Sequence, residues 1–200
     1  MNKEIEIRTQ LYPEQEKTLR EYLHANYEAT QTLHQTDYYL DNPQSPFFTT
    51  FPEGDKDASI FLRLRQTQNS TMLGVKHSHN VPGSRKPLYC NEYETKIEKL
   101  DETLKLFKLI GFTDVTVVNK TRTTFNVDNI LEIAVDEVEK CGTFMEIEVK
   151  KDVETIEEGY QLIYDWLRSI GIKKFKRQMK GYIHIIMNPA WEFGEKEITL

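Results

Sequence analysis

The chain has 200 residues, enough for one domain with a buried core, and no Gly-, Pro- or Ser-rich linker divides it. Its 32 acidic and 26 basic residues give a formal net charge of −6 at pH 7, which argues against bulk nucleic-acid binding but is compatible with a local basic pocket. Two cysteines argue against a disulfide framework. The charged start and the lack of a long apolar run predict a cytoplasmic protein with no signal peptide and no membrane span.

The first predicted strand covers residues 4–8, which read Glu-Ile-Glu-Ile-Arg. Because successive side chains of a strand point to opposite faces, the charged residues share one face and the isoleucines share the other. A helix is predicted from Pro13, a residue type that favours the first helical turn, with Leu19 and Leu23 on its buried side. Residues 35–41 are predicted to form a short strand.

The middle of the chain is predicted to contain a proline-containing loop at 42–59 and a β-hairpin that turns at 68–70. His77 and His79 are predicted to be loop residues rather than metal ligands, because no third nitrogen or sulfur ligand accompanies them. The next helix is predicted to end at Gly111 and to bury an apolar stripe of Ile97, Leu100, Leu104, Phe107 and Ile110. The remaining predicted elements are strands near 115–126, 128–136 and 144–150, a helix at 154–169, and a strand or short helix at 182–187.

Charges of like sign recur on the same faces of the predicted strands. Such charges repel each other unless opposite charge lies between them. The groups are the bases Arg63 with Arg65 and Lys120 with Arg122, and the acids Glu4 with Glu6, Glu92 with Glu94, Glu132 with Asp136, and Glu146 with Glu148. One explanation is the solvated face of an open antiparallel sheet. The other is a closed barrel whose charged lumen surrounds an anionic ligand and metal ions, and the clustering of like charges favours it.

These residues resemble the CYTH or triphosphate tunnel metalloenzyme family, which includes class IV adenylyl cyclases, thiamine triphosphatases, inorganic triphosphatases and fungal-type RNA triphosphatases. The family's N-terminal ExExK resembles Glu4, Glu6 and Arg8, with arginine in place of lysine. Its further basic elements resemble, in order, Arg63 with Arg65, Lys76, and Lys120 with Arg122. Residues 37–41 and 135–148 are similar to the class IV adenylyl cyclase branch. The resemblance implies a single domain over 1–200, with a core at about 4–187 and a tail at 188–200.

The implied fold is α+β: a closed antiparallel eight-stranded β-barrel, the triphosphate tunnel, with a charged lumen and helices packed outside. The implied cofactor is Mg²⁺ or Mn²⁺, since both ions take oxygen ligands. The implied metal ligands are Glu4, Glu6, Glu132, Asp136, Glu146 and Glu148. The implied substrate-binding residues are Arg8, Arg63, Arg65, Lys76, Lys120 and Arg122, whose cations suit phosphate oxygens. Tyr39 and Lys120 are the implied catalytic pair, and Arg177 or Lys180 is expected to reach the phosphates as well.

The function predicted first is metal-dependent hydrolysis of the terminal phosphoanhydride of tripolyphosphate, thiamine triphosphate or ATP. The alternative is a class IV adenylyl cyclase that converts ATP to cyclic AMP and pyrophosphate, since both reactions use the same cations and metals. A third hypothesis is a protein that binds polyphosphate or nucleotide without catalysis. The sequence does not decide whether the protein forms a homodimer.

Overall fold

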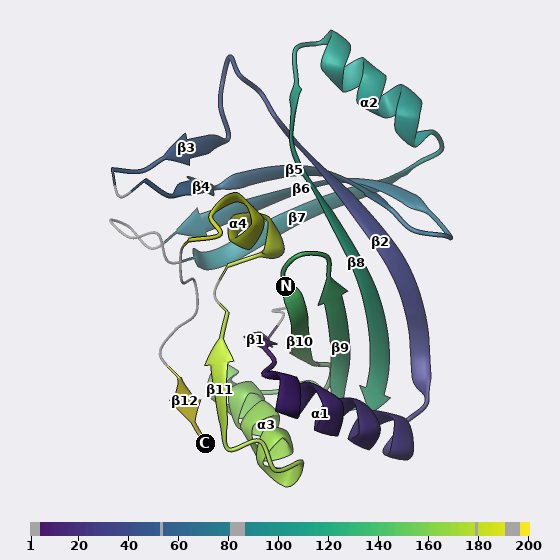
Figure 1. The fold of residues 1–200 in the computed structure, drawn as a ribbon, viewed down its shortest axis with the longest axis vertical. Helices are drawn as coiled ribbons and strands as arrows, with labels where there is room; N and C mark the ends of the chain where they lie inside the picture. The colour runs from purple at the N-terminus through teal and green to yellow at the C-terminus, as the bar shows by residue number, and fades with distance from the viewer. Residues whose placement is uncertain (1–4, 53, 81–86, 179, 191–196) are drawn as a thin grey trace. The chain divides into compact units, whose positions relative to one another are not determined.

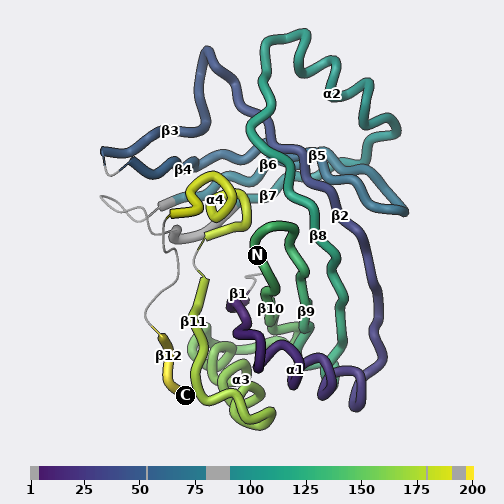
Figure 2. The backbone as a smooth tube through the Cα atoms, viewed as in Figure 1, coloured from purple at the N-terminus to yellow at the C-terminus, as the bar shows by residue number. Residues whose placement is uncertain are grey.

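The computed structural model describes residues 5–52, 54–80, 87–178, 180–190 and 197–200 (Figures 1 and 2). The chain forms two compact units. Unit 1 comprises Met1–Leu33, Lys120–Gly181 and Glu192–Leu200, and unit 2 comprises His34–Asn119 and Tyr182–Trp191. Two long strands, β2 (Ala29–Asp41) and β8 (Thr113–Val127), contribute residues to both units.

Unit 1 contains a sheet in the strand order β12-β11-β1-β10-β9-β8-β2. Beside β2 and β8, its strands are β1 (Glu6–Gln10), β9 (Leu131–Val138), β10 (Gly142–Val149), β11 (Lys174–Arg177) and β12 (Ile198–Thr199). The pairs from β12 to β8 are antiparallel. Their register sets Glu6 opposite Glu148, and Glu148 opposite Glu132, so three carboxylates lie in one row across adjacent strands. The strand β12 falls within the stretch predicted as a tail.

The apolar face of this sheet packs against two helices, α1 (Pro13–Asn26) and α3 (Ile156–Ser169). Ile7, Ile133 and Ile147 from the strands share one buried cluster with Leu23 of α1 and Leu167 of α3. Because side chains alternate along each strand, the charged residues of β1, β9 and β10 lie on the opposite face. The sequence predicted this division for residues 4–8, and it is confirmed for the described residues 5–8.

The starts of both helices follow from local residue chemistry. α1 begins at Pro13, as predicted, and α3 follows Thr155, whose side chain accepts a hydrogen bond of 3.1 Å from the Glu158 amide. Gly159 lies where α3 meets the residue just before β1: a Cβ atom there would be 2.7 Å from Cδ1 of Ile5. The missing side chain therefore allows α3 to pack closely on the sheet.

Unit 2 contains the strand order β2-β5-β6-β7, with β5 (Ile60–Gln66), β6 (Thr71–Asn80) and β7 (Pro87–Ile97). The helix α2 (Leu100–Leu109) packs on the apolar face of these strands. The buried side chains of this cluster are Leu40, Leu62, Leu64 and Leu100. Gly111 has a φ of +97° just after α2, as expected for the residue that ends a helix.

A second, two-stranded sheet in unit 2 packs against the short helix α4 (Tyr182–Met187), and consists of β3 (Phe48–Thr50) and β4 (Lys56–Ala58). The Asn188 side chain accepts a hydrogen bond from the Lys56 amide at 2.7 Å and donates one to the Lys56 carbonyl at 2.9 Å. The buried His184 ring is hydrogen-bonded to Asp57. The prediction of a loop over 42–59 is therefore wrong in part, because contacts with a distant segment order two strands within it.

The predicted α+β class with antiparallel pairing is confirmed. The loop prediction for His77 and His79 is wrong, because pairing with β5 and β7 extends β6 as far as Asn80. Ile110 was predicted to be buried but is 69% exposed, and Leu109 at the end of α2 is 83% exposed, so both lie outside the apolar cluster that α2 covers. Among the described residues, the strand pairings do not close the sheet into a barrel. No helix among the described residues combines the length and apolar character that a bilayer crossing requires.

Candidate functional site

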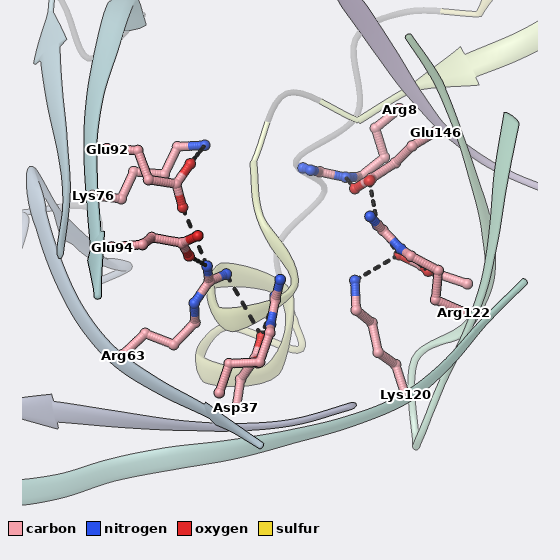
Figure 3. Close-up of polar contacts among 11 residues, drawn as sticks. Arg8, Asp37, Arg63, Lys76, Glu92, Glu94, Lys120, Arg122 and Glu146 are labelled. Atoms are coloured by element: carbon pink, nitrogen blue, oxygen red, sulfur yellow. Dashed lines mark hydrogen bonds and ion pairs between the residues drawn. The ribbon is translucent and has the colours of Figure 1, made fainter. Parts of the chain in front are cut away.

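The charged face of unit 1 carries a chain of ion pairs on β1, β10 and β8 (Figure 3). Arg8 Nε donates to Oε1 of Glu146 at 2.5 Å, and Nη2 of Arg122 donates to the other carboxylate oxygen. Arg8 and Glu146 lie opposite each other on adjacent strands. Glu146 therefore holds two guanidinium groups close together, which their like charges alone would oppose.

Asp136 on β9 fixes the basic pair of β8. Its side chain is fully buried and accepts from Lys120 Nζ at 2.9 Å, from Arg122 Nε at 2.7 Å and from Arg122 Nη2 at 2.6 Å. The register sets Arg122 directly opposite Asp136. One buried carboxylate thus orients both cations of the predicted Lys120–Arg122 pair.

Both carboxylates remain ionised because of their cations. Burial alone would raise the pKa of Glu146, but the charges of Arg8, Arg122 and Lys120 outweigh it and hold that pKa far below its usual value. Burial would likewise raise the pKa of Asp136, but the hydrogen bonds from Arg122 and the charge of Lys120 lower it instead.

The pKa shift of Glu146 predicts a specific loss of stability in acid. A lowered folded-state pKa contributes stability above the ordinary glutamate pKa of about 4.5, and this contribution disappears as pH falls through the folded value. We expect Glu146→Gln to make the decline in unfolding free energy below that pH shallower, by up to about 1.4 kcal/mol per pH unit. Urea denaturation between about pH 3 and 6 measures the slope. The exposed control Glu28→Gln should keep the wild-type slope, and equal slopes for all three proteins would contradict the assignment.

A row of more accessible carboxylates lies beside these buried pairs. Glu6, Glu148 and Glu132 stand opposite one another, and their side chains are 42%, 25% and 43% exposed. Lys150 Nζ lies 2.7 Å from Glu148 and 3.7 Å from Glu132. Glu148 and Glu132 offer carboxylate oxygens as metal-ligating atoms, and Mg²⁺ and Mn²⁺ prefer oxygen ligands.

The carboxylates do not converge as a preformed metal cage. Among the residues that the structure describes, no three His, Cys, Asp or Glu side chains are grouped so that they could hold an ion. Glu4, predicted as a metal ligand, lies outside the described residues. Of the other predicted ligands, Asp136 and Glu146 bind protein cations directly, whereas Glu6, Glu132 and Glu148 form the exposed row.

The charged face of unit 2 has a corresponding arrangement (Figure 3). Arg65 on β5 donates Nε and Nη2 to the two carboxylate oxygens of Asp37 on β2, at 2.6 and 2.7 Å, and Nη1 of Arg63 lies 3.8 Å from the same carboxylate. The Asp37 side chain is only 4% exposed. The buried Asp37 therefore binds Arg65 directly and lies near Arg63, two positions earlier on the same neighbouring strand.

Arg63 also contacts the acidic pair of β7. Its Nη2 lies 2.8 Å from Glu94 and 3.2 Å from Glu92, and Lys76 Nζ lies 3.7 Å from Glu92. Gly74 stands between Arg63 and Glu94 in the register, and a Cβ atom there would lie 3.3 Å from the Glu94 side chain. Glycine at this position therefore leaves room for the ion pair to form across β6.

Tyr39 lies directly opposite Arg63, on the same face of unit 2. Burial raises the pKa of its phenol, and the nearby charge of Asp37 raises it further, against the lowering effect of Arg63 and Arg65. The hydroxyl therefore stays protonated at neutral pH and is able to donate a hydrogen bond.

Arg177 and Lys180, the two candidates expected to reach the phosphates, lie in different surroundings. Arg177 lies over the Tyr160 ring, 5.0 Å from its centroid, and donates to the Tyr160 hydroxyl at 3.0 Å, so it faces α3. The Lys180 carbonyl accepts a 3.4 Å hydrogen bond from Arg8. The backbone at Lys180 therefore lies nearer the charged face of unit 1, whereas the Arg177 side chain faces α3.

The structure thus brings Arg8, Lys120, Arg122, Asp136 and Glu146 together in unit 1, and Tyr39, Arg63, Arg65 and Lys76 together in unit 2. The prediction omitted Asp37, which orients Arg65 and lies 3.8 Å from Arg63. The available signal was alternation, since Asp37 shares a strand face with Tyr39. Its role depends on the strand register, which the alternation does not reveal.

A sequence model of the CYTH domain matches residues 2–182. The chain belongs to the CYTH family.

One curated relative is the Methanocaldococcus jannaschii protein named "Putative adenylate cyclase MJ0240", which is 28% identical over 95 residues. The match covers 47% of this chain and 54% of the relative, so it spans about half the length of that protein.

The PH1012 protein of Pyrococcus horikoshii OT3 has a similar solved structure, with a TM-score of 0.66, 25% identity, and coverage of 90% of this chain and 98% of that one. A Hippeastrum protein named "Putative adenylyl cyclase HpAC1" has a TM-score of 0.68 at 18% identity, with 95% of this chain and 98% of that chain covered. HpAC1 is described as having a dominant triphosphatase activity. At this identity the likeness shows a shared fold only.

Proposed function

We propose that this chain is a divalent-metal-dependent triphosphatase that binds a triphosphorylated small molecule and hydrolyses its terminal phosphoanhydride. The observation that carries the proposal is a buried aspartate bound to a basic pair, which recurs in both units. Asp136 orients Lys120 and Arg122, and Asp37 orients Arg65 beside Arg63. Cations held in place in advance suit a polyanion whose charge is spread over several phosphoryl groups.

For the fold, we propose a closed eight-stranded antiparallel barrel, the triphosphate tunnel, with a charged lumen. Membership of the CYTH family supports it. The proposed substrate-binding residues are Arg8, Arg63, Arg65, Lys76, Lys120 and Arg122. Guanidinium groups match phosphate oxygens through paired N–H donors, while the lysines supply point charges.

The proposed cofactor is Mg²⁺ or Mn²⁺, and CYTH membership supports dependence on a divalent metal. Glu6, Glu132 and Glu148, together with Glu4, are the residues that would hold it. A bound ion would neutralise phosphate charge and activate the attacking water. Asp136 and Glu146 were predicted in the same set, but their buried pairing with Lys120, Arg122 and Arg8 supports a positioning role instead.

The chain's own residues supply positioning and electrostatics, the main contributions in phosphoryl transfer. Lys120 and Arg122 stabilise negative charge on the phosphoryl oxygens. The neutral Tyr39 hydroxyl donates a hydrogen bond near the attacked or leaving oxygen. No covalent intermediate on the protein is required, because water attacks the terminal phosphorus directly.

A class IV adenylyl cyclase is the second candidate, and the adenylate cyclase name of the M. jannaschii relative favours it. The two reactions differ in the phosphorus attacked: the terminal one by water, or the α-phosphorus by the ribose 3′-oxygen. Triphosphatase activity is proposed first because it requires no pocket for the adenine base.

The test is release of phosphate from tripolyphosphate and from thiamine triphosphate with Mg²⁺, with Mn²⁺, and with EDTA. We expect phosphate release that depends on the metal and falls at least about 100-fold in Glu6→Ala. Metal-dependent binding of tripolyphosphate without phosphate release would instead support a protein that binds polyphosphate without catalysis.

A further inference from the structure

Lys150 forms ion pairs with two of the three carboxylates of the exposed row in unit 1, Glu148 and Glu132. It directly follows β10, and its amide donates a 2.9 Å hydrogen bond to the Ile130 carbonyl. Its side chain is 43% exposed, and Nζ lies 2.7 Å from Glu148 and 3.7 Å from Glu132. The backbone hydrogen bond fixes where the side chain starts, and the ammonium lies within ion-pair distance of both carboxylates.

Glu148 and Glu132 stand directly opposite each other on adjacent strands. Like charges in such a cross-strand pair destabilise a sheet. The ammonium of Lys150 offsets this repulsion without a metal ion. A divalent ion that binds the same carboxylate oxygens would displace the ammonium.

We propose that Lys150 is an internal competitor of the divalent ion: it occupies Glu148 and Glu132 when no metal is bound and leaves them when the metal binds. This inference rests on the proposed function, because it assumes that these glutamates are metal ligands. Lys150 thereby sets the metal affinity of the site and stabilises the metal-free protein.

The exposure of this ion pair makes the exchange feasible. Exposed pairs contribute little net stability, so displacement of Lys150 by a divalent ion costs little. Glu146 and Asp136 differ, since a metal could reach them only by breaking buried pairs with Arg8, Arg122 or Lys120, which is far more costly. Lys150 therefore competes with the metal at Glu148 and Glu132, whereas Glu146 and Asp136 keep their protein cations.

The experiment compares Lys150→Met with Lys151→Met, its solvent-exposed neighbour of the same charge. Mn²⁺ binding is measured without substrate, by electron paramagnetic resonance of the free ion, on the full chain. Loss of an exposed ion pair predicts Mn²⁺ binding about 3- to 5-fold tighter in Lys150→Met and changed by less than about twofold in Lys151→Met. Without metal, Lys150→Met should also have a lower Tm than Lys151→Met, and added Mn²⁺ should raise its Tm by more.

Glu148→Gln separates a failure of this inference from a failure of the proposed function. If the wild-type chain binds Mn²⁺ and Glu148→Gln weakens that binding, the ion lies at the exposed row. If that holds while Lys150→Met binds Mn²⁺ no more tightly than Lys151→Met, the competition is wrong and the proposed metal site stands. If the wild-type chain binds no Mn²⁺, or Glu148→Gln leaves binding unchanged, the metal set itself is wrong and the competition is wrong with it.

Discussion

Replacement of Asp136 by asparagine is expected to lower the free energy of unfolding by about 3–5 kcal/mol. Asp136 is fully buried and accepts from both Lys120 and Arg122, and the Lys120 side chain is only 3% exposed. The change therefore leaves a buried ammonium beside a neutral amide, which costs far more than loss of an exposed pair. Urea denaturation at neutral pH measures the effect.

The matched control for Asp136→Asn is Glu132→Gln, on the same strand and the same face. Glu132 is 43% exposed and lies 3.7 Å from Lys150, so its neutralisation should cost less than about 1 kcal/mol. Equal losses for the two variants would show that Asp136 does not fix the basic pair.

Arg65→Ala is expected to reduce turnover of tripolyphosphate by about 100- to 1,000-fold, because it removes a cation held in place for the phosphates. The exposed arginine Arg168 on α3 provides the control, and Arg168→Ala should stay within about twofold of wild type. Initial rates at saturating metal provide the comparison. Turnover of Arg65→Ala near the wild-type rate would contradict the assignment of Arg65.

Loss of Arg65 also removes the bidentate partner of the buried Asp37, so Arg65→Ala should lose stability as well as activity. The double variant Asp37→Asn/Arg65→Gln replaces the charged pair by a neutral one of similar shape. Its unfolding free energy should return to within about 1–2 kcal/mol of wild type while its turnover stays low. Recovery of turnover together with stability would show that Arg65 acts through the fold rather than on the substrate.

The division of each strand into two faces could be predicted because it depends only on alternation. Ile7 is buried and Glu6 exposed, since a period of two leaves no other arrangement once one face packs on helices. Helix starts and ends were predictable for a similar reason: Pro13 and Gly111 act through their own backbone geometry.

The roles of Asp37 and Asp136 could not be predicted, because they depend on register between strands that are distant in sequence. Asp37 meets Arg65 across 28 positions, and Asp136 meets Arg122 across 14. The strands β3 and β4 were missed for a related reason, since Asn188 holds Lys56 from 132 positions away. Three-residue strands carry too short a pattern to be seen without such a partner.

The most direct test of the central claim is product analysis of ATP incubated with the protein and either Mg²⁺ or Mn²⁺, by mass spectrometry, with tripolyphosphate and thiamine triphosphate in parallel. We predict metal-dependent phosphate release from at least one of the three substrates and no cyclic AMP from ATP. Cyclic AMP with pyrophosphate would contradict the triphosphatase proposal and establish the adenylyl cyclase alternative.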